Sequence, residues 1–175
     1  MKRTQLERLD ARHDVTDFNS GNATLDEWLR RHALAAQLMD SARTFLVTAD
    51  GGIVGYFSLT MGSVLRADAP DKLVRGKPGY PVGMVLLARL AVDRSMHRKG
   101  FGALLLAEAL RKAVAAGEVA AARLVVVDAI DAIDAIDAID DSAATFYERF
   151  GFLRTPEHPL RLYRRMKDIR ASLGR

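Results

Sequence analysis

One stretch in the middle of the chain, Leu86 to Leu110, restricts the fold more than any other. An apolar run from Met84 to Val92 ends in Asp93, a short basic loop follows, and glycines then open an Ala- and Leu-rich segment with helical spacing. The order strand, loop, helix is typical of a mixed α/β domain built on one sheet. We therefore expect the rest of the chain to pack around this unit.

The loop in this stretch has the composition of an anion site. Basic side chains precede a Gly-x-Gly pair, in the order Arg94, His97, Arg98, Lys99, Gly100, Phe101, Gly102. Backbone N–H groups and the positive end of the helix dipole should converge there, which favours a phosphate. Glycine suits these positions because a side chain would hold the backbone away from the ligand or forbid the tight turn.

Two common phosphate motifs are excluded. The dinucleotide fingerprint G-x-G-x-x-G would need a glycine where Leu105 stands, and the chain has no G-x-x-x-x-G-K-[ST]. The stretch instead resembles the GNAT acetyltransferase superfamily, in which L-A-V-D followed by [QR]-x-x-G-x-[GA] holds the pyrophosphate of coenzyme A. Here His97 stands at the position that is usually Gln or Arg. Since the family binds phosphate mainly through main-chain donors, we expect the site to survive, with weaker or pH-sensitive affinity.

A second stretch resembles the same superfamily. Phe146 to Phe152 reads F-Y-x-x-x-G-F, which in the family marks a late helix and the strand after it. Taken alone, Tyr147 would be a half-buried packing residue. The resemblance implies that its hydroxyl protonates the departing thiolate, and Gly151 allows a left-handed helix end.

The resemblance implies a fold and a cofactor. The fold is a mixed central sheet with a V-shaped cleft where a bulged strand leaves its parallel neighbour, with helices on both faces. The cofactor is acetyl-CoA, and its amides would pair with free strand edges. The residues assigned to it are Leu90, Ala91, Val92, His97, Arg98, Lys99, Gly100, Phe101, Gly102, Ala103 and Phe146.

Composition limits the remaining possibilities. A chain of 175 residues predicts one domain over residues 1–175. Cysteine is absent, which removes disulfides, thiol catalysis and zinc-thiolate sites, and we expect no metal. The net charge is +4, and many acidic residues are concentrated between Asp131 and Asp141, so the remaining surface favours a polyanionic partner. No signal-peptide core and no membrane-length apolar run is present, so we expect a cytoplasmic protein.

The first half of the chain gives local predictions. The capping box T-x-x-E at Thr24 to Glu27 predicts a helix start. Its apolar face would hold Leu25, Trp28, Leu29, His32 and Ala36, with Trp28 more probable as a core anchor than as a substrate platform. His13 is expected in a turn; a catalytic role for it has no support. Strands over 44–48 and 53–59 form a hairpin, followed by a basic loop over 61–80.

Three basic residues are candidates for the acceptor site. Arg75 and Lys77 lie in the loop before the central strand, and solvated charge explains each of them singly as well. Arg89 lies inside an apolar strand, so it needs either a structural partner or a ligand in the cleft.

The second half contains a short repeat. After a helix over 100–116, ended by Gly117, a buried parallel strand is expected over 124–128. Asp-Ala-Ile is then repeated four times from Asp128 to Ile139, and its period of three fits neither helix nor strand. We interpret residues 128–141 as an insertion in a loop and hypothesise an acidic flap beside the cofactor cleft. A closing strand over 160–166 and a basic tail over 167–175 complete the chain.

Over nearly its whole length the chain resembles the acetyltransferase toxins of bacterial type II toxin–antitoxin pairs. The likeness rests on F-x-x-G-x-x-x-L-D-x-W-L at Phe18 to Leu29, on G-Y-F-S-L near Tyr56 and on L-A-R-L-A-V-D. It implies acetylation of the amino group of aminoacyl-tRNA, which blocks translation, together with a ribbon-helix-helix antitoxin and a homodimer. Because cysteine is absent, transfer would be direct, through a ternary complex. The alternatives are an acetyltransferase for a small-molecule amine or a protein N-terminus, and a catalytically impaired acyl-CoA-binding module.

Overall fold

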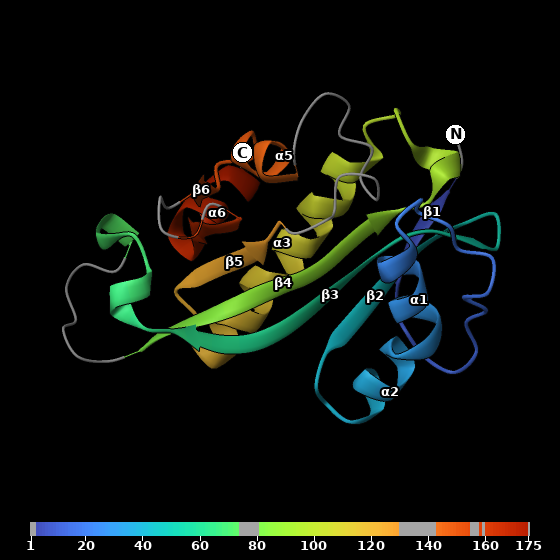
Figure 1. Ribbon diagram of the computed structural model, residues 1–175, viewed down its shortest axis with the longest axis horizontal. Coiled ribbons are helices and arrows are strands. Elements are labelled where there is room, and N and C mark those ends of the chain that lie inside the picture. Colours follow the sequence, from blue (N-terminus) through green and yellow to red (C-terminus); the bar gives the residue numbers. More distant parts are fainter. Residues whose placement is uncertain (1–2, 74–80, 130–142, 155–157, 159, 175) are drawn as a thin grey trace.

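A mixed β-sheet organises the molecule (Figure 1). The computed structural model describes residues 3–73, 81–129, 143–154, 158 and 160–174. The strands lie in the order β1-β2-β3-β4-β5-β7-β6, in which β4 and β5 are parallel and all other neighbours antiparallel. Their bounds are β1 Thr4–Arg8, β2 Arg43–Ala49, β3 Gly52–Val64, β4 Val82–Val92, β5 Leu124–Asp128, β6 Leu153–Arg154 and β7 Arg161–Arg165. The expected mixed α/β class is confirmed.

Helices cover both faces of this sheet. They are α1 Ala23–Arg31, α2 Ala33–Leu38, α3 Phe101–Ala120, α5 Ala143–Glu148 and α6 Met166–Leu173, with short 3-10 turns η1 Arg66–Asp68, η2 Asp71–Leu73 and η3 Arg94–Met96. Alternate residues of β4 separate two cores: Leu90 packs in the cluster of α3, whereas Ala91 packs in that of α1. Figure 1 shows α1 and α2 near β2, and α3 running along β4 toward α6. No helix in the described ranges is long and apolar enough to cross a bilayer.

The central strand β4 forks the sheet. It pairs with β5 only from Met84 to Leu87, but it pairs with β3 as far as Val92. Between these partners the register shifts, because Ser58 of β3 faces Arg89 while Leu59 faces Leu87. Ala88 is therefore the extra residue of a β-bulge, which bends a strand away from its neighbour. The expected bulge and the separation of β4 from β5 are both present.

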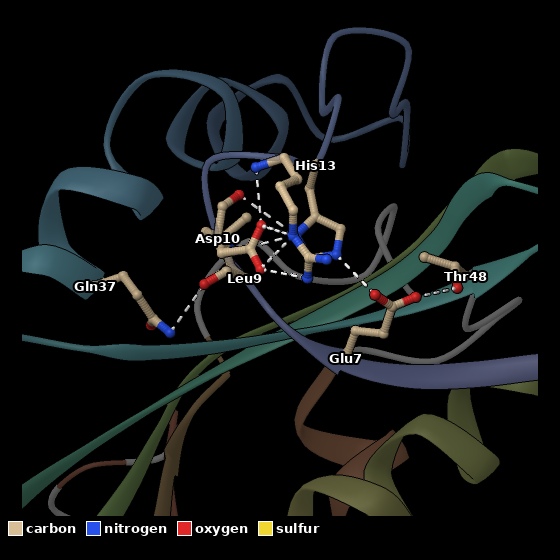
Figure 2. A network of polar contacts seen from close by, with 7 residues as sticks. Glu7, Leu9, Asp10, His13, Gln37 and Thr48 are labelled. Atoms are coloured by element: carbon tan, nitrogen blue, oxygen red, sulfur yellow. Dashed lines mark hydrogen bonds and ion pairs between the residues drawn. The ribbon is translucent and has the colours of Figure 1, made fainter.

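The first helix differs from the prediction in start and end. Asn22 is the N-cap, and its side chain accepts a hydrogen bond from the Leu25 N–H at 3.1 Å. The expected capping box at Thr24 is wrong. The helix also breaks at His32, which is exposed rather than on the buried face. Gln37 takes a buried position instead, since its amide donates to the Leu9 carbonyl at 3.2 Å, a signal that apolar spacing does not contain (Figure 2).

His13 belongs to a polar cluster that braces β1 (Figure 2). Its Nδ1 accepts the Asp10 N–H at 3.0 Å and its Nε2 lies 3.1 Å from the Glu7 carboxylate. The Thr48 hydroxyl donates to the other oxygen of Glu7 at 3.1 Å. These bonds lower the pKa of Glu7, with the His13 bond as the larger cause. The expected turn role of His13 is confirmed.

Three later boundaries also differ from the prediction. α3 does not end at Gly117 but continues to Ala120. A Cβ on Gly117 would lie 2.6 Å from the Met166 Cε, so this glycine lets α6 pack closely. The expected basic tail is helix α6, held by buried Ile169. β3 extends past the predicted end to Val64 because it stays paired with β4.

Candidate active site

The predicted phosphate turn links β4 to α3. After β4 ends, Asp93 caps η3 by accepting the Ser95 N–H at 3.0 Å. The backbone then passes through positive φ at Arg98 (60°) and Gly100 (71°) before α3 begins at Phe101. Gly100 has no side chain to cap the helix, and the first N–H groups of an α-helix have no acceptor within it. These N–H groups are the donors that an anion would use.

Two side chains of the turn brace it rather than extend from it. The His97 Nε2 lies 2.7 Å from the Val92 carbonyl, so this nitrogen carries the proton and donates it. The Lys99 Nζ donates to the Ser95 carbonyl at 2.7 Å. His97 thereby ties the turn to the end of β4, which agrees with a site built mainly from main-chain donors.

The gap beside β4 adds a second feature. From Ala88 to Val92 the strand has β3 on one side but is no longer paired with β5 on the other. Main-chain groups on that side can pair with an extended, amide-bearing chain, as in strand addition to a sheet edge. This is the edge on which Leu90 and Val92 were expected to bind the cofactor arm.

Tyr147 lies in the core on the α3 side of the sheet. Its side chain is 2% exposed, and its ring lies edge-on to Phe146 and Phe152, with centroids at 5.2 and 5.7 Å. In the described part of the chain its hydroxyl makes no hydrogen bond. Burial raises the pKa of this phenol, so it keeps its proton at neutral pH. A buried hydroxyl without a partner is unusual in a folded protein and fits a ligand atom beside it.

The opposite face of β4 presents Arg89. Its guanidinium carbon lies 3.9 Å from the centre of the Trp28 ring, and that ring stacks on Tyr56 at 6.2 Å. Tyr56 is fixed in turn, because its hydroxyl donates to the Leu25 carbonyl at 2.7 Å. Partial burial lowers the pKa of Arg89, and within the described ranges no carboxylate is ion-paired with it. Trp28 is thus half-buried packing and a platform for this cation at once.

Some predicted site residues cannot be placed. Arg75 and Lys77 lie outside the described residues, as does the repeat from residue 130 onward. The first repeat unit is anchored, since Arg161 donates two hydrogen bonds to the Asp128 carboxylate at 2.7 and 2.9 Å and Ala129 is buried. Among the residues that can be described, no group of three His, Asp or Glu is placed to hold a metal ion.

Sequence reasoning missed the loop before α1 as part of this region. Asn19 bonds to Asp93 and Arg94 at the start of the turn, while Ser20 bonds to buried Asp26. The run Asn19-Ser20-Gly21-Asn22 did indicate a loop. Nothing local could indicate its docking partner, which is 74 residues away.

Known proteins resemble this chain in both sequence and structure. The acetyltransferase (GNAT) domain family matches residues 40–154. The chain is 40% identical over 167 residues, 95% of each protein, to a tRNA-acetylating toxin of Mycobacterium tuberculosis. Among solved structures, AtaT complexed with acetyl-methionyl-tRNAfMet matches with a TM-score of 0.80 and 26% identity, covering 97% of this chain and 99% of that one. AtaTR bound with AcCoA matches at 0.78 and 27%, covering 97% of each chain.

Proposed function

The chain belongs to the GNAT acetyltransferase family, and on that premise we propose that it transfers the acetyl group of acetyl-CoA to the amino group of an aminoacyl-tRNA. The choice of acceptor is supported by the 40% identity to a tRNA-acetylating toxin across 95% of both chains. The net charge of +4 suits an RNA, whose phosphates attract a basic surface.

The observation that carries the chemistry is the buried hydroxyl of Tyr147, which makes no hydrogen bond to any described residue. When bound, acetyl-CoA supplies an acetyl thioester. Main-chain N–H groups over 97–103 would hold its diphosphate, and the β4 edge at Leu90 to Val92 would align its amide-bearing arm. Phe146 would hold the Tyr147 ring in place beside the cofactor, since the two buried rings pack edge to face.

Tyr147 then acts as general acid. As the acetyl group passes from sulfur to the attacking nitrogen, Tyr147 would donate its phenolic proton to the leaving sulfur. The proton lost by the amine returns through water to restore the phenol. A covalent acetyl-cysteine is excluded because the sequence has no cysteine. Direct transfer, within a ternary complex, is the route that we propose.

Arg89 serves the acceptor side of this proposal. It carries a positive charge, lies next to the bulge and is oriented by Trp28, so it can meet a phosphate or carbonyl near the aminoacyl end. Arg75 and Lys77 remain expectations for the same RNA. We further propose a ribbon-helix-helix antitoxin, a homodimer and a cytoplasmic place of action, which the resemblance to toxins supports. Co-purification would test the antitoxin and light scattering the homodimer.

The decisive experiment is mass spectrometry of charged tRNA after incubation with acetyl-CoA. We expect an N-acetylated aminoacyl end with the wild type and a rate at least about tenfold lower with Tyr147→Phe, the effect of losing a general acid. Polyamines, aminoglycosides and peptides serve as competing acceptors. Acetylation of one of these with none of charged tRNA would refute the RNA assignment, and acetyl-CoA binding without any transfer would indicate a binding module.

A further inference from the structure

The loop before α1 is fastened to the start of the phosphate turn. The Asn19 N–H donates to the Asp93 Oδ2 at 3.0 Å, and the Arg94 N–H donates to the Asn19 carbonyl at 2.9 Å. These two bonds, here called the Asn19–Asp93 clasp, join segments 74 residues apart in sequence. They connect the acceptor side of the molecule directly to the cofactor side.

Asp93 divides its carboxylate between the two segments. One oxygen, Oδ2, belongs to the clasp, and the other, Oδ1, accepts the Ser95 N–H at 3.0 Å within the turn. Its own N–H is held by the Val54 carbonyl of β3 at 2.9 Å. A shift of the turn on binding an anion must therefore move a carboxylate that also holds Asn19.

The loop is joined to α1 just as firmly at its other end. The Ser20 hydroxyl donates to Asp26 Oδ1 at 2.6 Å and the Ser20 N–H to the same oxygen at 3.0 Å, and both residues are buried. Gly21 has a φ of 91°, and a Cβ there would lie 3.1 Å from the Arg94 Nε. Glycine at this position lets the Arg94 side chain lie against the loop.

We propose that the Asn19–Asp93 clasp couples the cofactor turn to α1, so that coenzyme A bound at the turn strengthens binding of the acceptor. α1 carries Trp28, which orients Arg89, so a change at Asn19 reaches the acceptor side through Ser20 and Asp26. Asp93 is a positioning residue in this scheme. The identity of the acceptor rests on the proposed function, but the coupling itself does not.

Hydrogen exchange with coenzyme A as the only ligand tests the clasp. In the wild type, saturating coenzyme A should slow exchange of peptides covering residues 17–31, because the clasp transmits the order of the turn to these amides. Asp93→Ala and Ser20→Ala should lose this protection. Ser20→Ala should keep its affinity for coenzyme A by calorimetry, since Ser20 bonds to α1 and not to the turn.

Ser41→Ala is the matched control. It removes a hydroxyl that donates to the Ala36 carbonyl at 3.2 Å at the end of α2, and the coenzyme A effect should persist. If Asp93→Ala does not fold, Ser20→Ala decides alone. The proposal would be overturned if coenzyme A did not slow exchange over 17–31 in the wild type. It would also be overturned if coenzyme A slowed this exchange in folded Asp93→Ala or Ser20→Ala as much as in the wild type.

Kinetics supply the second readout. With charged tRNA as acceptor, Asp93→Ala and Ser20→Ala should each raise the KM for the acceptor about fivefold, which is the lower end of typical couplings between sites. The kcat should stay nearly unchanged. Asp93→Asn keeps one acceptor oxygen, so its KM for the acceptor should lie between those of the wild type and Asp93→Ala. Absence of transfer to charged tRNA alongside protection by coenzyme A would refute the RNA acceptor and leave the clasp standing.

Discussion

The guanidinium carbon of Arg89 lies 3.9 Å from the centre of the Trp28 ring. The arginine follows the bulge at Ala88, and the tryptophan lies on α1, so two separate elements fix the charge. This contact holds the cation in one orientation without neutralising it. Under the proposed function, this charge is available to a phosphate of the acceptor.

Replacing Arg89 should therefore damage acceptor binding and spare cofactor binding. We expect Arg89→Ala to raise the KM for charged tRNA at least about fivefold, since a charge-assisted hydrogen bond to a phosphate contributes about 1 kcal/mol or more. Lysine should not restore the value, because it lacks the planar group that stacks on Trp28. Lys112→Ala, which removes a cation 5.1 Å from the Phe45 ring, is the control and should leave this KM unchanged.

Removal of the Tyr147 hydroxyl should not lower stability. The buried hydroxyl makes no hydrogen bond in the described part of the chain, so Tyr147→Phe removes an unpaired polar group and should keep or raise the free energy of unfolding. Tyr163→Phe is the comparison, because that hydroxyl donates to the Asp68 carbonyl at 2.9 Å. It should cost about 0.5–1.5 kcal/mol in urea unfolding. A large loss in Tyr147→Phe would mean that the hydroxyl has a structural partner.

Gly100 should matter for the cofactor through its backbone conformation. Its φ is 71° and nothing would meet a Cβ there, so Gly100→Ala introduces strain without a clash. We expect a loss of about 1 kcal/mol in stability and weaker coenzyme A binding by calorimetry. Gly51→Ala, at a φ of 82° in the β2–β3 turn and equally open, should show the same strain with normal binding. Equal coenzyme A affinities in the two variants would contradict the assignment of the turn.

Shortening the repeat should alter acceptor binding alone. Deletion of residues 131–139 keeps Asp128 and Ala129, which are anchored by Arg161 and by burial. Removing three aspartates should lower the KM for charged tRNA, because their charges repel phosphates. A triple change to asparagine at 131, 134 and 137 should have the same effect at unchanged length. No effect on KM in either variant would leave the repeat inert.

Local sequence signals predicted the central unit well. The apolar run, the glycines and the helical spacing predicted β4, the turn and the start of α3, because each depends on neighbours in the chain. The bulge and the gap were expected from the family resemblance alone. Gly117 misled the prediction since it was interpreted as a helix end, whereas a glycine inside a helix also permits close packing, here of Met166.

Other features were not predicted because they depend on contacts between residues far apart in the sequence. The side chain of Asp93 bonds to Asn19 through a fold that no local pattern encodes, and Gln37 is buried by hydrogen bonds rather than by apolarity. α6 was missed because only Met166 and Ile169 of its eight residues are buried. Such a short, charged segment carries a weak periodic signal.

The fork in β4 also has a mechanical consequence. Four rungs between Met84–Leu87 and Leu124–Val127 join strands β1 to β4 to the remaining strands of the sheet. When a force pulls β4 away from β5, the pairing should break first at Leu87, beside the gap, and then toward Met84. A ligand bound in the opening would then bridge the two parts of the sheet. The force needed to separate them should increase with the ligand concentration.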